Sequence, residues 1–351
     1  MQSIDCSVRI GRHLIGEGHP CYVIAEAGLN HNGDLHMALE LVDRAADAGA
    51  TVVKFQKRTV DILAVGAVLD AEDQRFPSFG RTYREVREHL EFDAGQYREL
   101  VSHAAAKGIA FLCTPFDIPA LEFLEPLGLD AYKVASHSVT NLPLLERLAE
   151  LGRPVIMSTG MCTLEEIDRA VDMFDRRQTP MALMHCVSAY PTPVDQCNLR
   201  MMDALRARYG VPVGYSGHEQ GLLPTLAAVA RGAALVERHL TLSKTLEGFD
   251  HKLSLEPDDF RGMVDDIRLV EQALGSGRKV VSETETVTRR KYHVSIVAAV
   301  DIAPGTIVTA AMLTLKNPGT GLPASRLSSI VGRRALGAVA ADTLVTAEMF
   351  E

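Results

Sequence analysis

The sequence predicts an α/β protein in which a (β/α)8 TIM barrel is followed by a small β-rich domain. Eight short apolar runs alternate with eight helical segments over about 270 residues, the repeat that builds such a barrel. Polar side chains follow the carboxyl ends of these runs, where a barrel carries its catalytic groups. After residue 277 the repeat stops, and short apolar stretches separated by turns begin.

Short apolar runs mark the expected barrel strands. Each has four to six residues and is bounded by polar or turn-forming residues, as buried parallel strands are. In chain order they occupy residues 22–25, 51–55, 109–113, 131–134, 155–158, 181–186, 211–215 and 233–236. Before them, residues 7–15 alternate apolar and polar side chains around Gly11, which predicts a small hairpin.

Helical segments separate the strands, and most of them are followed by a glycine that can end a helix. They occupy residues 35–48, 94–106, 118–127, 142–151, 164–174, 199–208, 222–231 and 257–274. A doubly wound sheet is the alternative arrangement. It would usually carry a glycine-rich phosphate loop after the first strand, and residues 26–33 do not form one. The loop at 58–87 is long, as loops that cover a substrate often are.

The composition changes toward the carboxyl terminus, which divides the chain into three parts. We expect a barrel domain at 1–281, a polar and charged linker at 282–293, and a β-rich domain at 294–351. The last part is close to the lower size limit for an independent core, so we expect it to pack on something else.

Charge and composition narrow the classes of partner. The 351 residues carry a net charge of −9 and no basic run of the kind that binds phosphate backbones, so nucleic acid is not expected. The six cysteines are scattered without a Cys-x-x-Cys pair, which is typical of buried thiols in a reducing compartment. No signal-peptide pattern and no apolar stretch approaching ~20 residues occurs. We therefore expect a cytoplasmic protein without a membrane span.

Two lysines, Lys54 and Lys133, end or lie in predicted strands near the barrel axis. Buried lysines are costly unless an anion meets them. Together with the hydroxyls of Ser136, Ser158 and Ser216, they could hold a phosphate and a carboxylate, and phosphoenolpyruvate carries both. The alternative is a lysine–glutamate ion pair, for example with Glu26.

Two histidines follow the last two predicted strands. His218 lies in Gly214-Tyr-Ser-Gly-His218 and His239 in Glu237-Arg-His239, so both imidazoles are expected at the same end of neighbouring strands. Such a pair suits a divalent metal and leaves positions open for water and substrate. The alternative for each is a core or surface histidine.

The ordered set of motifs resembles the sialic acid synthase family, including its C-terminal antifreeze-like (SAF, β-clip) domain. The motifs are Glu26-Ala-Gly-Leu-Asn-His-Asn-Gly-Asp34, Val53-Lys-Phe-Gln56, Tyr132-Lys-Val-Ala-Ser136, Ser158-Thr-Gly-Met161, Ser188-Ala-Tyr-Pro191, Gly214-Tyr-Ser-Gly-His218, Glu237-Arg-His239 and Asp250-His251. The stretch 235–275 is especially similar to the animal N-acetylneuraminate-9-phosphate synthases.

The resemblance implies a reaction and a set of residue roles. Phosphoenolpyruvate would condense with N-acetylmannosamine or its 6-phosphate to give a nine-carbon 2-keto sugar acid, with release of phosphate. Mn²⁺ or Mg²⁺ would bind His218 and His239, and Glu26 would act on the sugar or accept a proton. Ser188, Tyr190 and Asp250 would orient the sugar. A homodimer with exchanged C-terminal domains is also implied.

The acceptor sugar stays open because the chain departs from the family pattern on the sugar side. Asn317, in Lys316-Asn-Pro-Gly319, stands where bacterial members carry an arginine for the acetamido group, and Ser188 stands where an asparagine is usual. A diacetamido or a non-acylated sugar is therefore an alternative. Arg81 is a candidate for a sugar phosphate, or else an exposed arginine.

Three other functions remain as alternatives. A phosphoenolpyruvate-dependent aldol synthase for seven- or eight-carbon keto acids would share the lysines but would not need the C-terminal domain. A metal-dependent deoxy-sugar lyase would share the histidines. The antifreeze-like tail alone would be compatible with a non-enzymatic ice-binding or surface protein, but the polar strand ends argue against that function.

Overall fold

The computed structural model describes residues 7–351 and divides the chain into two compact units. The first unit ends at Gly275, and the second comprises Ser276–Glu351. Cys6 lies outside the described residues; the other five cysteines are free thiols, and Cys162 alone among them is not fully buried. No described helix combines the length and the apolar character that a membrane crossing requires.

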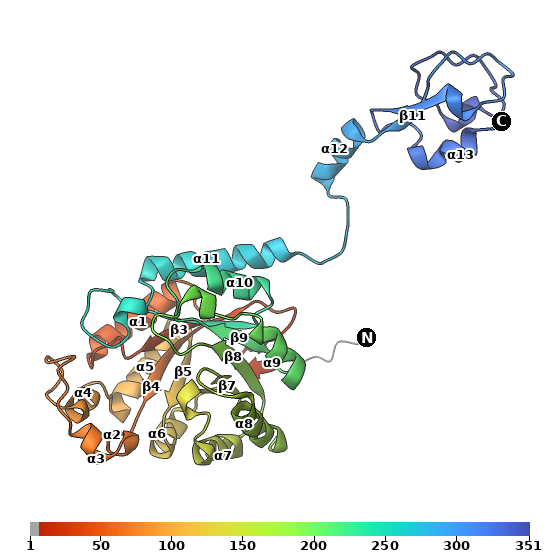
Figure 1. Cartoon of the computed structure of the whole chain (residues 1–351). Helices are drawn as coiled ribbons and strands as arrows, with labels where there is room; N and C mark the ends of the chain where they lie inside the picture. The colour runs from red at the N-terminus through yellow and green to blue at the C-terminus, as the bar shows by residue number, and fades with distance from the viewer. Residues whose placement is uncertain (1–6) are drawn as a thin grey trace. The chain divides into compact units, whose positions relative to one another are not determined.

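The first unit is a closed barrel of eight parallel strands, which confirms the predicted fold class (Figure 1). Neighbouring strands follow in the order β10-β3-β4-β5-β6-β7-β8-β9. Their bounds are β3 Tyr22–Gly28, β4 Val52–Lys57, β5 Ala110–Pro115, β6 Tyr132–Val134, β7 Val155–Ser158, β8 Met181–Cys186, β9 Val213–Ser216 and β10 Leu235–His239. The barrel closes where β10 pairs with β3, and His239 lies opposite Glu26.

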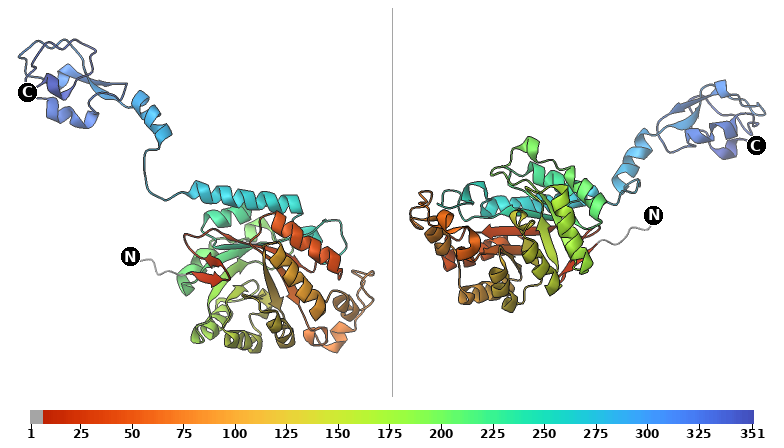
Figure 2. Two further views of the ribbon diagram at one scale, coloured as in Figure 1. Left: turned by 180° about the vertical axis from the view of Figure 1, so that it is seen from behind. Right: turned by 60° about the horizontal axis from the view of Figure 1, so that its bottom comes forward.

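Helices lie outside the strands, in the places that the sequence indicates (Figure 2). The first unit has α1 Leu35–Asp47, α2 Val60–Leu63, α3 Gly66–Leu69, α4 Tyr83–His89, α5 Ala94–Ala106, α6 Ile118–Leu124, α7 Leu142–Leu151, α8 Leu164–Arg176, α9 Met201–Tyr209, α10 Leu223–Ala230 and α11 Pro257–Leu274. Short 3-10 helices are η1 Glu125–Leu127, η2 Ser136–Ser138, η3 Val194–Gln196 and η4 His251–Leu253. The long loop at 58–87 thus contains three short helices that the sequence analysis did not predict.

Local sequence signals explain where several helices begin and end. Asp93 and Thr163 form capping boxes at α5 and α8, since each side chain accepts from the third helical N–H while that residue's side chain accepts from the cap. Gly152, after α7, has a φ of 64°, a left-handed conformation in which glycine avoids the strain of a Cβ atom.

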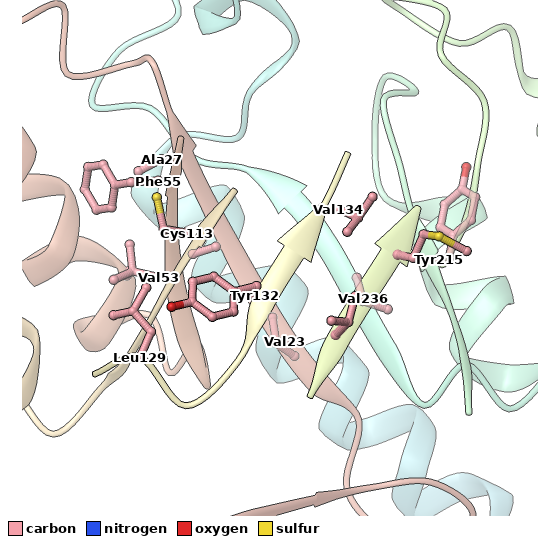
Figure 3. Close-up of a cluster of buried hydrophobic side chains, with 14 of the residues drawn as sticks. Val23, Ala27, Val53, Phe55, Cys113, Leu129, Tyr132, Val134, Tyr215 and Val236 are labelled. Atoms are coloured by element: carbon pink, nitrogen blue, oxygen red, sulfur yellow. The ribbon is translucent and has the colours of Figure 1, made fainter. Parts of the chain in front are cut away.

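Successive residues of each barrel strand belong alternately to two apolar cores. Residues such as Val23, Val53, Phe55 and Val236 face outward and pack against the helices (Figure 3). A second cluster, which includes Ile24, Val52, Leu112, Ala131, Ile156 and Leu235, fills the interior of the barrel. Because successive strand residues point to opposite faces, the residues two positions further on also face inward. Glu26, Lys54, Thr114, Lys133, Ser158 and Glu237 therefore lie above the apolar layer.

The predicted hairpin forms and belongs to the interior cluster. Strands β1 Val8–Ile10 and β2 His13–Ile15 pair in antiparallel fashion. Val8, Ile10 and Ile15 are buried among the interior residues that start the barrel strands. The hairpin therefore covers the end of the barrel opposite the catalytic face.

The last two strands differ from their predicted bounds. The sequence analysis ends the eighth strand at residue 236 and places His239 beyond it, but β10 continues through His239 because Leu235–His239 pairs with all of Tyr22–Glu26. Glu237 and His239 consequently point inward on alternate positions of one strand, whereas Arg238 points away from the barrel axis.

The second unit has its own core and matches the expected β-rich, loop-heavy module. Strands β11 Ser295–Ala298 and β12 Leu313–Lys316 pair in antiparallel fashion, and isolated bridges join the remaining turns. Its short helices are η5 Ala310–Met312, η6 Ala324–Arg326, α13 Leu327–Ile330 and η7 Ala347–Met349. Ile296, Val308, Ile330 and Phe350 belong to its buried cluster.

The predicted linker, 282–293, contains helix α12 Glu283–Tyr292. Ser282 forms a capping box with Glu285, and Arg289, Arg290 and Lys291 lie in the last turn. These charges complement the helix dipole. No residue of α12 is buried, so apolar periodicity could not reveal it. The predicted boundaries at 281 and 293 stay predictions.

Candidate active site

One cavity lies at the carboxyl ends of the barrel strands, and it collects eleven of the twelve predicted site residues. They come from seven strands and the loops that follow them: Glu26, Lys54, Lys133, Ser136, Ser158, Ser188, Tyr190, Ser216, His218, His239 and Asp250. The twelfth, Asn317, belongs to the second unit, where its side-chain amide donates to the Tyr292 carbonyl at 3.0 Å. A role for Asn317 in sugar binding stays a prediction.

The floor of the cavity is an ion network of two lysines and two glutamates. Lys54 Nζ lies 3.0 Å from Glu26 Oε2 and 3.3 Å from Glu237 Oε1. Lys133 Nζ lies 3.5 Å from Glu237 Oε2. The lysine–glutamate alternative therefore applies to both lysines, which are not free cations waiting for an anion. Glu237 was quoted in a motif, but the sequence analysis gave it no role.

Burial and mutual charge act differently on the members of this network. Burial opposes the charge of Lys54, but Glu237 and Glu26 together outweigh it and raise the pKa of Lys54. Burial outweighs the single close carboxylate at Lys133, so the pKa of Lys133 is lowered. Burial works against the Glu237 charge, but Lys133 and Lys54 hold its pKa well below the ordinary value. Of the two lysines, Lys133 is therefore the one whose charge is less fully compensated by the glutamates.

Hydroxyl groups surround the lysines. Lys133 Nζ donates to Ser158 Oγ at 2.8 Å, and Ser216 Oγ donates to Glu237 Oε1 at 3.3 Å. Ser136 Oγ accepts from the Gly160 N–H at 2.9 Å. A Cβ at Gly160 would lie 2.4 Å from Ser188 Oγ and 3.0 Å from Ser136 Oγ, so a larger residue here would displace the Ser188 hydroxyl.

The two histidines meet at the side of the cavity formed by β9 and β10, with ring centroids 5.5 Å apart. His218 Nδ1 lies 3.1 Å from the Val187 carbonyl, which fixes that ring and leaves Nε2 for another partner. His239 Nδ1 is buried without a hydrogen-bond partner in the described residues and lies 3.9 Å from Asp250 Oδ2. An orphaned imidazole nitrogen beside a second imidazole fits a divalent metal.

The pair alone does not make a closed metal site. In residues 7–351 no cluster of three or more His, Cys, Asp or Glu side chains has a metal-holding arrangement. A metal on His218 and His239 would therefore take its other ligands from water and substrate, as catalytic rather than structural sites do.

The residues expected to orient a sugar lie around the histidines. The centroids of the Tyr190 and His218 rings lie 4.3 Å apart, and Tyr190 is 56% exposed. Gln56 Nε2 donates to Glu26 Oε1 at 2.5 Å, so Gln56 helps to orient this carboxylate. Gln56 follows Lys54 by two positions and thus faces inward by the same alternation.

The cavity contains a second group of residues to which the sequence analysis gave no role. Arg58, Arg87, Phe116, His137 and Phe249 line it together with Asp250. Arg81, the arginine considered for a sugar phosphate, is exposed and does not line the cavity. Alternation along β4 is the signal that could have identified Arg58. Lys54 and Gln56 face inward, and Arg58, one residue after the strand, continues the same series.

A buried ion pair on the outer side of β10 holds the His218 loop in place. Arg238 Nη1 lies 3.0 Å from Glu219 Oε1, and Arg238 also donates to the Glu219 and Gly221 carbonyls. Glu219 further accepts from Tyr215 and Thr225. Because Arg238 precedes His239 and Glu219 follows His218, this pair ties the two histidine-bearing segments to each other.

Replacing Arg238 with methionine is expected to lower the free energy of unfolding by about 3–5 kcal/mol, since Glu219 would stay buried without its charge partner. Metal affinity should also fall, because the His218 loop loses its anchor. Denaturant unfolding and calorimetric titration with Mn²⁺ measure the two effects. Arg208→Met is the matched control: its ion pair with Asp168 is at the surface, so the substitution should change the free energy of unfolding far less than Arg238→Met and leave metal affinity unchanged.

Comparisons with known proteins agree with this geometry. A sequence model of the NeuB family matches residues 41–279, and one of the SAF domain matches residues 293–351. The chain is 38% identical to the N-acetylneuraminate-9-phosphate synthase of Homo sapiens, over 96% of this chain and 94% of the relative. It is 37% identical to the N,N'-diacetyllegionaminic acid synthase of Campylobacter jejuni, over 92% and 98%.

A solved structure matches as well. The crystal structure of the N-acetylneuraminic acid (sialic acid) synthetase from Leptospira borgpetersenii, in complex with citrate, superimposes with a TM-score of 0.72 and 34% identity. The match covers 82% of this chain and 96% of that one.

Proposed function

The chain belongs to the NeuB family of phosphoenolpyruvate-dependent condensing enzymes, and from this premise we propose that its acceptor is an open-chain hexosamine-type aldose. N-acetylmannosamine or its 6-phosphate is the proposed acceptor, and the product is a nine-carbon 2-keto sugar acid. The observation that carries the proposal is the convergence of paired lysines, paired histidines and sugar-orienting side chains in one cavity.

The similar proteins limit the range of possible acceptor sugars but do not select one sugar. Identities of 38% to an N-acetylneuraminate-9-phosphate synthase and 37% to an N,N'-diacetyllegionaminic acid synthase are nearly equal. A diacetamido sugar is therefore the second candidate acceptor, and Ser188 and Asn317 are the departures that keep it open.

Phosphoenolpyruvate is proposed to bind over the floor of the cavity. Lys133, whose charge burial opposes, gains most from the anion, and Ser136, Ser158 and Ser216 offer hydroxyl donors beside it. Lys54 stays paired with Glu26 and Glu237, so it contributes charge while holding both carboxylates in place.

A divalent ion, Mn²⁺ or Mg²⁺, is proposed to bind His218 and His239. When bound, it would supply Lewis-acid polarisation of the sugar aldehyde. The ring of Tyr190 against His218 and the carboxylate of Asp250 beside His239 would orient the sugar hydroxyls on the same side of the cavity.

The proposed reaction forms one carbon–carbon bond and one carbon–oxygen bond to water, and it breaks the carbon–oxygen bond between C2 and the phosphate. C3 of phosphoenolpyruvate attacks the aldehyde carbon, and the aldehyde oxygen takes a proton and becomes a hydroxyl. Water adds to C2, where positive charge develops, and loses a proton. The resulting tetrahedral carbon carries a hydroxyl; it expels inorganic phosphate, which takes up the hydroxyl proton, and becomes the 2-keto group. Glu26, which Gln56 and Lys54 orient, is proposed to accept the proton lost by water or to act on the sugar.

A panel of acceptors tests the proposal. The protein is incubated with phosphoenolpyruvate, Mn²⁺ and each of N-acetylmannosamine, its 6-phosphate, a diacetamido hexose, mannosamine, erythrose 4-phosphate and arabinose 5-phosphate. Phosphate release and product mass are followed. We expect release and a nine-carbon product with a hexosamine, and none after chelation of the metal. Absence of phosphate release with every aldose would contradict the proposal.

The homodimer with exchanged C-terminal domains and the cytoplasmic location stay predictions. Family membership favours the enzyme over the ice-binding or surface protein that the tail alone would permit.

A further inference from the structure

Two arginines of the segment after β4, Arg58 and Arg87, line the cavity but take no part in the chemistry proposed above. Arg58 directly follows β4 and is 9% exposed, and Arg87 lies in α4. Arg58 Nη1 and Arg87 Nε and Nη1 are buried, and none has a hydrogen-bond partner within residues 7–351. Buried guanidinium donors without acceptors are costly, so they indicate a ligand that supplies the acceptors.

Aromatic rings hold both guanidinium groups in place. The Arg58 guanidinium carbon lies 3.7 Å from the centroid of Phe116, and that of Arg87 lies 4.3 Å from the centroid of Phe249. Stacking occupies the faces of the groups and leaves the in-plane N–H donors available. Arg58 Nη2 donates to Gln56 Oε1 at 2.5 Å, and this acceptor is a neutral amide.

The two positive charges act on the same surroundings. His137 lines the cavity between them; burial lowers its pKa, and Arg58 and Arg87 lower it further. Burial and then the charge of Arg87 lower the pKa of Arg58 to about 10. The nearby carboxylate of Glu91 is occupied by Lys57 Nζ at 2.8 Å. The Asp250 carboxylate also lines the cavity and acts on Arg58, but neither carboxylate accepts from the buried donors that lack a partner within residues 7–351. An anion would supply those acceptors.

The arginines are separate from the lysines on the floor. Arg58 follows Lys54 by four positions along an extended segment, a rise of up to roughly 13 Å. Lys54 and Lys133 lie next to the apolar layer, whereas Arg58 is grouped with residues of the loops after β4, β5, β6 and β10. A ligand with two anionic ends, or two ligands with one anionic end each, could occupy both sites.

We propose that Arg58 and Arg87 form an anion subsite that binds a phosphate on the acceptor sugar, at the end remote from its aldehyde. The inference rests on the proposed function and deepens it: the acceptor class is a phosphorylated hexosamine rather than the free sugar. Guanidinium groups suit a phosphate, since its oxygens can accept charge-assisted hydrogen bonds from the donors of both arginines at once.

The test compares acceptors in matched variants. At saturating phosphoenolpyruvate, kcat/KM is measured for N-acetylmannosamine and for its 6-phosphate in the wild type, Arg58→Gln, Arg87→Gln and Arg81→Gln. The wild type should favour the phosphorylated sugar at least ~10-fold, and each cavity variant should reduce that ratio toward one, a loss of roughly 10–100-fold for lost charge-assisted bonds. Arg81→Gln, on the same segment but outside the cavity, should keep the wild-type ratio.

Several outcomes would overturn the proposal. One is a wild-type ratio near one. Another is a rise in the KM for phosphoenolpyruvate in both cavity variants with the acceptor ratio unchanged, which would assign the arginines to that substrate. If the wild type prefers a hexuronic acid to the 6-phosphate, the subsite binds a carboxylate rather than a phosphate. If Arg58→Gln fails to fold, Arg87→Gln alone tests the subsite, because Arg87 is only half-buried.

Failure of the proposed function is distinguishable from failure of this subsite. If no sugar supports phosphate release, calorimetric titration with mannosamine 6-phosphate still measures the subsite. The wild type and Arg81→Gln should bind it, and Arg87→Gln should bind it at least ~10-fold more weakly. Equal binding by all three would refute the subsite whatever the reaction is.

Discussion

Replacing His218 with alanine is expected to abolish metal-dependent turnover, with kcat falling at least ~10³-fold, about 4 kcal/mol of lost transition-state stabilisation. His218 supplies one of the two imidazoles that face each other at 5.5 Å between ring centroids, and its fixed Nδ1 leaves Nε2 free. The remaining His239 would hold a divalent ion through a single protein nitrogen. Phosphate release with added Mn²⁺ measures turnover, and calorimetric titration with Mn²⁺ measures affinity.

A histidine of the neighbouring strand provides the control. His185 lies in β8, but its Nε2 is hydrogen-bonded to the Cys197 carbonyl at 2.8 Å and it does not line the cavity. His185→Gln should therefore keep both Mn²⁺ affinity and turnover. Retained activity of His218→Ala in the presence of Mn²⁺ would refute the assignment of His218 as a metal ligand.

Replacing Lys133 with methionine is expected to reduce kcat/KM for phosphoenolpyruvate by roughly 10²–10³-fold, because a buried charged partner of the anion would be lost. The effect on stability should be smaller, about 1–3 kcal/mol. Burial already opposes the Lys133 charge, and Glu237 keeps Lys54 at 3.3 Å as a counterion. Initial rates at varied phosphoenolpyruvate and denaturant unfolding measure the two effects.

Glu237→Gln is the comparison that separates an anion site from a structural ion pair. It removes a negative charge shared by Lys54 and Lys133, so it should lower stability by about 3 kcal/mol without weakening phosphoenolpyruvate binding. Unchanged affinity for phosphoenolpyruvate in Lys133→Met would mean that the lysines only neutralise the glutamates. Equal loss of affinity in both variants would mean that the intact network, rather than the lysine charge, is needed.

The barrel was predictable because its strands are buried on both faces and its helices end at glycines. Short apolar runs such as 155–158 and 181–186 therefore stand out from the helical segments. Helices without a buried face were not predictable. The residues of α12 are all exposed, and α2 and α3 have four residues each, too short to show a period.

Most of the cavity was predictable as well, because the ends of parallel strands in a barrel must meet on one face. The relations between its members were not. The sequence analysis left open whether Lys54 binds an anion or pairs with a glutamate such as Glu26. It did not identify Glu237, 183 residues further along the chain, as a second partner. A sequence cannot show which carboxylate reaches which lysine, since that depends on the register between β10 and β3 and on side-chain directions.

The arginines illustrate the same limit. The sequence analysis considered Arg81, in a loop near glycine and tyrosine, for a sugar phosphate. Arg81 is exposed, whereas Arg58 and Arg87 line the cavity. The difference depends on how the loop of 58–87 folds into α2, α3 and α4 and on the rings of Phe116 and Phe249, which come from two other loops.

The sequence by itself determined the barrel, the family and the face on which the site lies, since apolar alternation and strand-end polarity are properties of local segments. Only the tertiary structure decided that the two lysines share Glu237 and that Arg238 and Glu219 anchor the His218 loop. It also decided that Arg58 and Arg87 line the cavity with buried N–H donors that find no acceptor within residues 7–351. These are contacts between segments far apart in the chain, and their energies depend on distances and burial that no single segment specifies.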